Sequence, residues 1–266
     1  SGASLIWSPR SNLALYGDTA PITAYHNLGV PIGLGTDWPV SGSMNMLREL
    51  RCAVDFNREQ LGNALRNADL WRMTTAGSAY TVGAAHEIGV IKTGALADLL
   101  LFEKRSADPF ADFVDLELPH IQWLSRGGVP LYGAKELVSP LRQGCEAVNI
   151  CGAEQALCVE AEIGKNLAAL QQELDSDIYP LYFCDTPAAE PACVASRNAN
   201  ETLAPLAPYP AATHDQDGDG IHDDADLCPQ VFDPVRIFDL DLLRDADHDG
   251  IGDVCDRCPL EAGNQS

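Results

Sequence analysis

Two copies of one aspartate-rich loop, 30 residues apart near the C-terminus, restrict the possible fold of this chain more than any other feature. The segments DQDGDGIHDDAD (215–226) and DADHDGIGDVCD (245–256) place acids at loop positions 1, 3, 5, 9 and 12, with glycine at position 6. So many carboxylates at close range repel one another unless a cation neutralises them. Alternate residues of a tight loop point oxygens inward, and Ca²⁺ takes about six to eight oxygen ligands. The spacing predicts two calcium sites rather than a disordered acidic tail.

The two loops supply a defined set of oxygen ligands. Gly220 and Gly250 allow the sharp turn, and position 7 supplies a backbone carbonyl instead of a side chain. The predicted calcium ligands are Asp215, Asp217, Asp219, Ile221, Asp223 and Asp226 in the first loop and Asp245, Asp247, Asp249, Ile251, Asp253 and Asp256 in the second. Asp239 and Asp241 are further candidates, although their segment, DLDLL, lacks the glycine.

Much of the chain's negative charge lies in this acidic module. Residues 215–256 contain 14 Asp and two basic residues, which is −12 of the formal −22. Nucleic-acid binding needs clustered Lys and Arg, so we expect no nucleic-acid partner. No run approaches about 18 apolar residues, and the first residues do not resemble a signal peptide, so the sequence shows neither a membrane span nor an export signal.

The first part of the chain alternates apolar runs with helical patterns. Strands are predicted at 3–7 and 30–36, separated by a helix within 18–29 that Gly29 closes. Near-continuous apolar strands in a βαβ pattern are typical of parallel strands covered on both faces. Further helices are predicted over 43–60 and over 67–83, the second capped by Asn67 or Asp69. Short strands and turns then follow as far as residue 140.

Eight of the nine cysteines lie after residue 144, in a loop-rich and Pro-rich region. Such clustering is typical of disulfides and hence of an oxidising compartment. The alternative is a zinc site, for which Cys255 and Cys258 have C-x-x-C spacing, but no second Cys or His pair follows them. Cys52 is expected to be a buried free thiol in a helix.

No amphipathic helices flank the two loops, so they do not form an EF-hand pair. The spacing of acids, glycine and cysteine over Asp215 to Pro259 instead resembles thrombospondin type 3 repeats. In that family bound ions form the core of a strand-poor structure, and successive cysteines are joined. The resemblance implies a Cys228–Cys255 disulfide and a partner for Cys258 beyond Ser266.

The segment PIGLGTDWPVSGS (31–43) ends a predicted strand on one acid, Asp37. In (β/α)8 enzymes the catalytic residues lie at the C-terminal ends of the barrel strands, so a carboxylate at such a position is a catalytic candidate. An Asp that ends a strand can equally form a turn or cap a helix. The surrounding pattern, WSPRSNLALYG followed by LGVPIGLGTDW-x-x-SGS-x-N-x-L-x-EL, resembles the last two βα units of the amidohydrolase superfamily, in its chlorohydrolase and cytosine-deaminase-like branch. The similarity covers about residues 1–135, including IKTGALADLLLF (91–102), which is similar to the strand entering the family's small β domain.

This resemblance implies a role for three residues. Asp37 corresponds to the residue that ends strand 8, where it binds the catalytic metal, zinc or a similar divalent ion, or serves as general base toward the metal-bound water. Ser11 and Asn12, at the end of strand 7, would line the same active-site opening of the barrel and contact a small-molecule substrate with a C–N bond. A turn that closes the strand explains Ser11 and Asn12 at least as well. The family's H-x-H pair is absent from this sequence.

We therefore expect an α/β fold: a C-terminal fragment of a (β/α)8 barrel, about strands 7 and 8, with part of a small β-sandwich domain and a strand-poor, calcium-bound, disulfide-containing tail. The expected domains are 1–87 (partial barrel), 88–140 (small β domain), 141–213 (Cys-containing extension and Pro/Ala-rich linker) and 214–266 (calcium repeats). The extension resembles those of some secreted bacterial amidohydrolases, for which we predict Cys184–Cys193 and Cys151–Cys158 pairs and leave Cys145 unassigned.

The sequence thus favours the C-terminal fragment of an exported, metal-dependent hydrolase of non-peptide C–N bonds, inactive as an isolated chain. The alternative is a calcium-stabilised cell-surface or adhesion protein whose barrel remnant catalyses nothing. Both place the protein outside the cytosol: extracellular, associated with the cell surface, or periplasmic.

Overall fold

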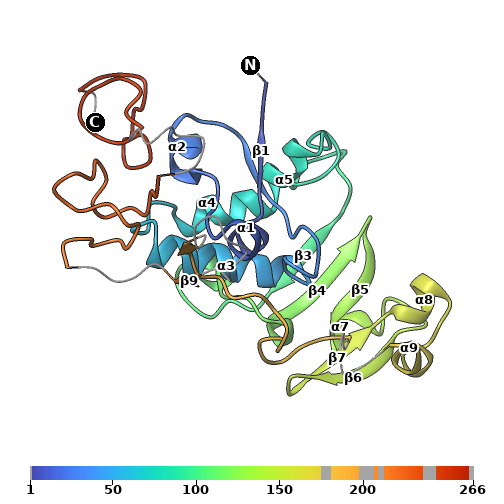
Figure 1. The fold of residues 1–266 in the computed structure, drawn as a ribbon. Helices are drawn as coiled ribbons and strands as arrows, with labels where there is room; N and C mark the ends of the chain where they lie inside the picture. The colour runs from blue at the N-terminus through green and yellow to red at the C-terminus, as the bar shows by residue number, and fades with distance from the viewer. Residues whose placement is uncertain (1, 175–180, 198–206, 209–212, 236–243, 264–266) are drawn as a thin grey trace. The chain divides into compact units, whose positions relative to one another are not determined.

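The computed structural model describes residues 2–174, 181–197, 207–208, 213–235 and 244–263. It divides into two compact units, one made of residues 1–82 and 190–266 and the other of residues 83–189. Helices and strands occur in both units, so the mixed α/β class is confirmed (Figure 1). Most of the predicted Pro/Ala-rich linker lies outside the described residues, as do Asp239 and Asp241.

Two short parallel strands lie in the first unit, as the apolar runs predict. They are β1 (Leu5–Trp7) and β2 (Ile32–Leu34), paired along their whole length. The connection between them contains α1 (Pro9–Tyr16) and α2 (Ile22–Asn27). After α2 the chain turns through Gly29, whose φ of 69° is the left-handed conformation expected of a helix-ending glycine. All three residues of β2 are buried, which explains its uninterrupted apolar sequence.

Helix α3 (Met46–Glu59) begins at Asn45, whose side chain accepts a hydrogen bond from the backbone N–H of Arg48 at 3.0 Å. Such a cap satisfies one of the amide groups that a helix start leaves unpaired. One face of the helix buries Leu50 and Phe56, each 1% exposed. The helix predicted over 43–60 is therefore present and contributes a large share of the core.

The helix predicted over 67–83 forms as two helices, α4 (Asn67–Thr74) and α5 (Ala76–Thr81). Neither predicted residue is the N-cap, which is Arg66. Asn67 is the first helical residue, and Asp69, in the first turn, accepts a hydrogen bond from the backbone N–H of Arg66 at 3.0 Å. Gly77 lies so close to β2 that a Cβ on it would be 2.1 Å from the carbonyl oxygen of Ile32. Only glycine permits this approach of α5 to the strand.

One five-stranded antiparallel sheet organises the second unit, with strand order β3-β4-β5-β7-β6. Its strands are β3 (Leu99–Phe102), β4 (Ile121–Arg126), β5 (Val129–Ala134), β6 (Glu146–Ile150) and β7 (Ala153–Leu157). The sheet continues across residue 140, where the sequence predicts a domain boundary. The sequences of β6 and β7, EAVNI and AEQAL, are too polar to predict as strands, but β7 pairs with β5.

Short helices and one two-stranded ribbon complete the described secondary structure. In the second unit they are α6 (Pro109–Val114), a 3₁₀ turn (Leu118–His120), α7 (Lys135–Val138), α8 (Val159–Ile163) and α9 (Leu167–Glu173). In the first unit, β8 (Ser196–Arg197) pairs with β9 (Ala207–Pro208). Among the described residues, no helix is long and apolar enough to cross a bilayer.

The hairpin of β6 and β7 shows why the predicted Cys151–Cys158 pairing is wrong. Cys151 and Gly152 form its two-residue turn, with φ of 54° and 89°, and a type I′ turn requires positive φ at both positions. Cys158 directly follows β7 and so lies at the opposite end of the hairpin. There it bonds to Cys145, with Cα atoms 3.9 Å apart.

The predicted Cys184–Cys193 pair and the free thiol at Cys52 are also wrong. Cys52, fully buried on α3, bonds to Cys193, and Cys184 bonds to Cys151. Cys184 and Cys193 belong to different units, because the chain passes from the second unit to the first between residues 189 and 190. The Cys52–Cys193 bond closes a separation of 141 residues and fixes the segment 190–193 to α3.

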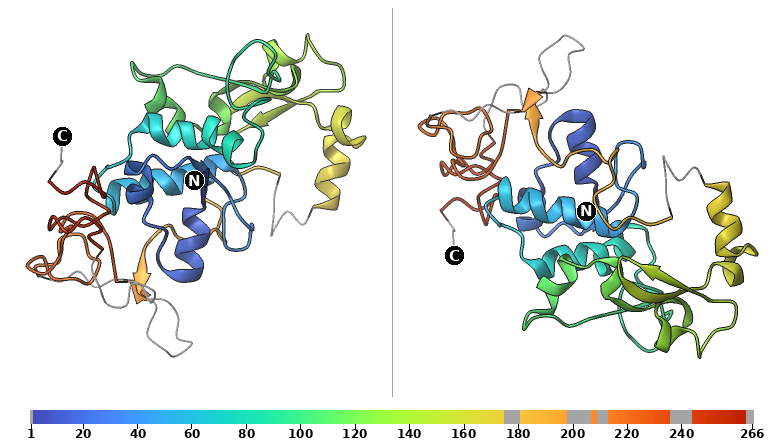
Figure 2. Two further views of the ribbon diagram at one scale, coloured as in Figure 1. Left: turned by 90° about the horizontal axis from the view of Figure 1, so that it is seen from above. Right: turned by 90° about the horizontal axis from the view of Figure 1, so that it is seen from below.

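The described tail, residues 213–235 and 244–263, consists of successive loops without a helix or strand, which both views of Figure 2 show (orange to red). Cys228 and Cys255 are bonded, with Cα atoms 5.7 Å apart, so this disulfide is confirmed. Together with Val254 they pack against Ala24 of α2. Cys258 has no disulfide partner among the described residues.

Removing the long-range disulfide should destabilise the first unit. We expect the double variant Cys52→Ala, Cys193→Ala to lose about 2–4 kcal/mol of unfolding free energy, because the unfolded chain regains loop freedom. Urea titration followed by tryptophan fluorescence measures this loss. Cys258→Ala, which breaks no disulfide in the described structure, is the control, and equal urea midpoints for the double variant and the control would contradict the role assigned to this bond.

Candidate functional site

Asp37 lies just beyond the C-terminal end of β2, and Ser11 lies in the first turn of α1, just beyond β1. Because the strands are parallel, their C-terminal ends are neighbours, and the two side chains meet. The hydroxyl of Ser11 donates a hydrogen bond to Oδ2 of Asp37 at 2.5 Å. Ser11 is fully buried, whereas Asp37 is exposed. The Asp37 side chain is thus held by the buried Ser11 hydroxyl and is open to solvent.

The backbone around Asp37 is held in an unusual conformation. Its φ is 53°, in the left-handed region that Asp tolerates better than most residues. The loop closes through hydrogen bonds from Gly42 and Ser43 to the carbonyls of Trp38 and Thr36, at 2.6 and 3.2 Å. A Cβ at Gly42 would lie 2.0 Å from the Thr36 oxygen, so the loop requires glycine there. The motif TDWPVSGS therefore encodes a closed loop that presents Asp37.

Ser41, which the sequence analysis missed, also belongs to this cluster. It is 6% exposed, and its hydroxyl lies 3.1 Å from that of Ser11. Asn12 has a different neighbourhood: its Oδ1 accepts from Thr19, whose hydroxyl accepts from the indole of Trp7 at 2.8 Å. These bonds connect α1 to the buried end of β1. Asn12 as a substrate ligand stays a prediction.

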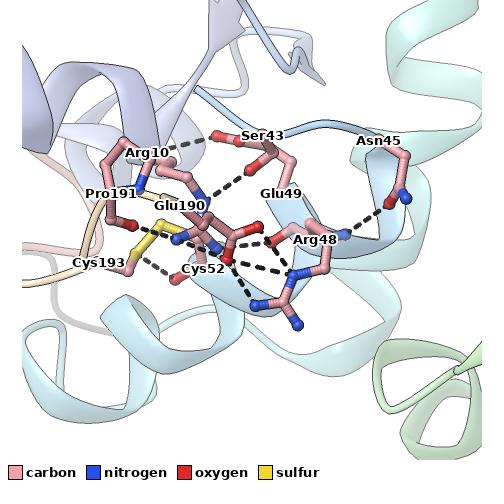
Figure 3. A network of polar contacts seen from close by, with 9 residues as sticks. All are labelled: Arg10, Ser43, Asn45, Arg48, Glu49, Cys52, Glu190, Pro191 and Cys193. Atoms are coloured by element: carbon pink, nitrogen blue, oxygen red, sulfur yellow. Dashed lines mark hydrogen bonds and ion pairs between the residues drawn. A yellow bond between two sulfur atoms is a disulfide. The ribbon is translucent and has the colours of Figure 1, made fainter. Parts of the chain in front are cut away.

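A buried ionic network fixes the start of α1 beside this cluster (Figure 3). The guanidinium of Arg10, 4% exposed, pairs with Glu190 at 3.1 Å and donates to the hydroxyl of Ser43 at 2.7 Å. It also donates to the backbone carbonyls of Pro191 and Arg48. Arg48 in turn donates to both carboxylate oxygens of Glu190. Segment 190–193, bonded through Cys193 to α3, thereby bridges α1 and α3.

Glu49 is the least solvated carboxylate of this network. It is fully buried on α3, and its Oε1 accepts from the backbone N–H of Arg10 at 3.1 Å. Its Oε2 has no hydrogen-bond partner among the described residues. Burial raises the pKa of Glu49, and its hydrogen bonds and the charge of Arg10 only partly offset this.

The first aspartate loop brings three predicted ligands together. One carboxylate oxygen each from Asp215, Asp217 and Asp219 lies within 4.8 Å of the others. Oδ1 of Asp215 and Oδ2 of Asp217 are buried and accept no hydrogen bond from the described residues. Burial, with the charge of neighbouring aspartates, raises the pKa of Asp217 to about 7 and that of Asp219 to about 6. Buried oxygens without a donor fit a cation that binds oxygen.

Other acids of the first loop also take part in its geometry. Asp223 accepts from the backbone N–H of Gln216 at 2.8 Å, and Asp226 from that of Cys228 at 2.7 Å. Each of these two bonds uses Oδ1, so Oδ2 of Asp223 and of Asp226 does not take part in it. Gly220, at position 6, has a φ of 92°, as the predicted turn requires.

The second loop repeats the main features of this arrangement. Its Asp245, Asp247 and Asp249 form the second group of oxygens within 4.8 Å. Asp253 and Asp256 accept from the backbone N–H groups of Ala246 and Cys258, 30 residues after the equivalent bonds of the first loop. The two loops thus share these two backbone-to-carboxylate bonds.

The zinc site implied by the resemblance is incomplete in this chain. Among the described residues, the groups of three or more metal-binding side chains are the two aspartate clusters, and neither contains Asp37. Zinc takes about four protein or water ligands, and here a single carboxylate is in place. The described residues therefore do not by themselves fit a zinc ion at Asp37.

Two protein-family models match this chain, one in its N-terminal half and one in the aspartate-rich tail. Residues 2–135 match the model of the amidohydrolase family, and residues 213–234 and 244–262 match the thrombospondin type 3 repeat. Both resemblances expected from the sequence are thereby confirmed.

Individual relatives match less than half of the chain. A putative aminohydrolase of Methanothermobacter thermautotrophicus is 36% identical over 43% of this chain and 29% of its own length. A 5-methylthioadenosine/S-adenosylhomocysteine deaminase of Pelotomaculum thermopropionicum is 37% identical over 36% of this chain and 23% of its own. The chain thus spans about a quarter of these curated relatives. A zinc-bound adenosine deaminase from Xanthomonas campestris superposes with a TM-score of 0.43 at 25% identity, covering 48% of this chain and 31% of that one.

The stability of the Glu49→Gln variant, compared with that of the wild type, should increase as the pH rises. Because burial raises the pKa of Glu49 in the folded state, its contribution to stability is present below its unfolded pKa of about 4.3 and is lost as the pH rises through the folded value. Glutamine does not titrate, so the stability of the variant relative to the wild type should increase as the pH rises above the unfolded pKa of about 4.3. Urea midpoints measure the difference. The exposed Glu59→Gln on the same helix is the control, and an identical pH dependence in Glu49→Gln and the wild type would show that Glu49 is not the titrating group.

Proposed function

The chain belongs to the amidohydrolase family, and on this premise we propose that it supplies the last two βα units of a (β/α)8 hydrolase that acts on non-peptide C–N bonds. In this proposal Asp37 is at the mouth of the active site, and the aspartate repeats form a calcium-binding tail. The isolated chain is inactive because most of the metal ligands come from elsewhere in the barrel.

The observation that carries this proposal is the meeting of Ser11 and Asp37 at the C-terminal ends of two paired parallel strands. Barrel enzymes place their catalytic groups at this end. The exposed Asp37 carboxylate can reach solvent and substrate, while the buried Ser11 and Ser41 fix its direction. In the whole enzyme Asp37 would bind the metal or take a proton from the attacking water and return it to the leaving nitrogen.

The substrate class follows from the relatives that are named deaminases. We propose a small molecule with an amino group on a ring, from which hydrolysis releases ammonia. 5-Methylthioadenosine and S-adenosylhomocysteine, which appear in the names of several relatives, are therefore the first probes.

The tail is proposed to bind two calcium ions, one in each aspartate loop. Three observations support this: the repeated ligand spacing, the match to thrombospondin type 3 repeats, and, in both loops, buried carboxylate oxygens to which no described residue donates. A bound ion supplies the positive charge that these acids lack. The four disulfides and the repeats favour an extracellular, cell-surface or periplasmic location.

The hydrolase proposal is tested on the whole protein that carries this chain. Asp37→Asn should lower kcat/KM for ammonia release by about 10²–10⁴-fold, the usual contribution of general acid–base catalysis. Asp55→Asn, on α3, is the control and should stay close to the wild type. Full activity in Asp37→Asn would refute the role of Asp37. A whole protein that hydrolyses no aminated ring with any divalent metal would favour the alternative of a surface protein with a non-catalytic barrel remnant.

The calcium proposal is tested on the chain itself by titration calorimetry. We expect two sites, and Asp219→Ala and Asp249→Ala should each weaken one of them about tenfold or more, because each removes a carboxylate ligand. Asp224→Ala is the matched control, since Asp224 lies in the first loop at a non-ligand position with its side chain 92% exposed. No heat at millimolar calcium would contradict the assignment.

A further inference from the structure

The first aspartate repeat is joined to the amidohydrolase-like core by a buried aromatic side chain, Phe232. It lies six residues after the last position of the first loop, yet it is only 3% exposed. Its ring packs edge-on against Phe56 of α3, with centroids 6.3 Å apart. Phe56 makes the same kind of contact with Trp7 of β1 at 6.4 Å. A continuous line of rings thus runs from the repeat to the strand that precedes Ser11.

Backbone contacts hold Phe232 between the core and the loop. Its N–H donates to the carbonyl of Gln60, just after α3, at 2.8 Å. The next residue, Asp233, donates its N–H to Oδ2 of Asp219 at 3.1 Å. Asp219 is the position-5 ligand of the first loop and is 2% exposed. One carboxylate therefore belongs to the candidate calcium site and also orients the residue next to the buried ring.

The second repeat has the same backbone arrangement without the aromatic side chain. Oδ2 of Asp249 accepts from the N–H of Gly263 at 3.1 Å, as Oδ2 of Asp219 does from Asp233. The residue equivalent to Phe232 is Ala262, which is exposed. The second repeat does reach the core, but at α2, where Val254 packs on Ala24 and the amide of Asn27 donates to the carbonyl of Asp256.

We propose that calcium in the first loop fastens Phe232 onto α3, so that the stability of α3 depends on calcium through the first loop and not through the second. This rests on the proposed calcium function of the tail. Without the ion, the carboxylates around Asp219 repel one another and favour opening of the loop that positions Asp233 and Phe232. Calcium binds the closed loop alone, and a ligand that binds one state stabilises everything packed with that state.

Hydrogen-exchange mass spectrometry of the full chain, with and without calcium, tests the coupling. We expect calcium to slow exchange in the peptide covering α3 by about tenfold or more in the wild type. Asp219→Asn should abolish this slowing, whereas Asp249→Asn should retain it. The two variants are matched because each aspartate accepts one hydrogen bond at position 7 and one 14 residues further along the chain.

A second variant separates coupling from binding. Phe232→Ala keeps every predicted ligand, so calorimetry should still show two calcium sites, but the slowing at α3 should be lost. Equal slowing in Phe232→Ala and the wild type, or equal loss in Asp249→Asn and Asp219→Asn, would overturn the proposal. Absence of calcium binding in the wild type would overturn the calcium function itself, and the calorimetric titration distinguishes that failure from binding without coupling.

Discussion

The parallel pairing of β1 with β2 is the interaction on which the rest of the first unit depends. It places the residues that follow each strand side by side, so that Ser11 and Asp37, 26 positions apart, share a hydrogen bond. Two three-residue strands cannot form a stable sheet alone, because such a ribbon buries too little apolar surface. Their geometry therefore depends on what packs around them.

Three kinds of contact supply that packing. Helices α3, α4 and α5 bury the strands, with Gly77 allowing α5 to approach β2 closely. Segment 190–193 joins α1 to α3 through the Glu190 ion pairs and the Cys52–Cys193 bond. Phe232 of the first repeat extends the same core through Phe56. The extension and the tail thus take part in the fold of the amidohydrolase-like part.

Local patterns in the sequence predicted local structure well. The apolar runs predicted both strands of the first unit, the helical pattern over 43–60 predicted α3, and the repeat spacing predicted the three-aspartate groups in both loops. Each of these signals lies within about a dozen residues, where periodicity and turn chemistry act directly. The family pattern around Asp37 identified the residue that the fold presents at the strand ends.

Long-range partners could not be predicted in the same way. Nothing near Arg10 indicates Glu190, and nothing near Cys52 indicates Cys193, because those pairings exist only once the chain has returned to the first unit. The predicted Cys151–Cys158 pair is wrong because the register of the β6–β7 hairpin puts the two residues at opposite ends. Ser41 was overlooked because a serine in a glycine-containing loop reads as a turn residue.

The central claim is that Asp37 serves the metal-dependent chemistry of a complete barrel. Anomalous diffraction at the zinc edge, from crystals of the whole protein grown with zinc, tests it most directly. The account predicts a zinc peak within about 2.0–2.2 Å of a carboxylate oxygen of Asp37, or one water molecule further away. A zinc site elsewhere in the barrel, with Asp37 far from both the ion and its water ligands, would contradict it.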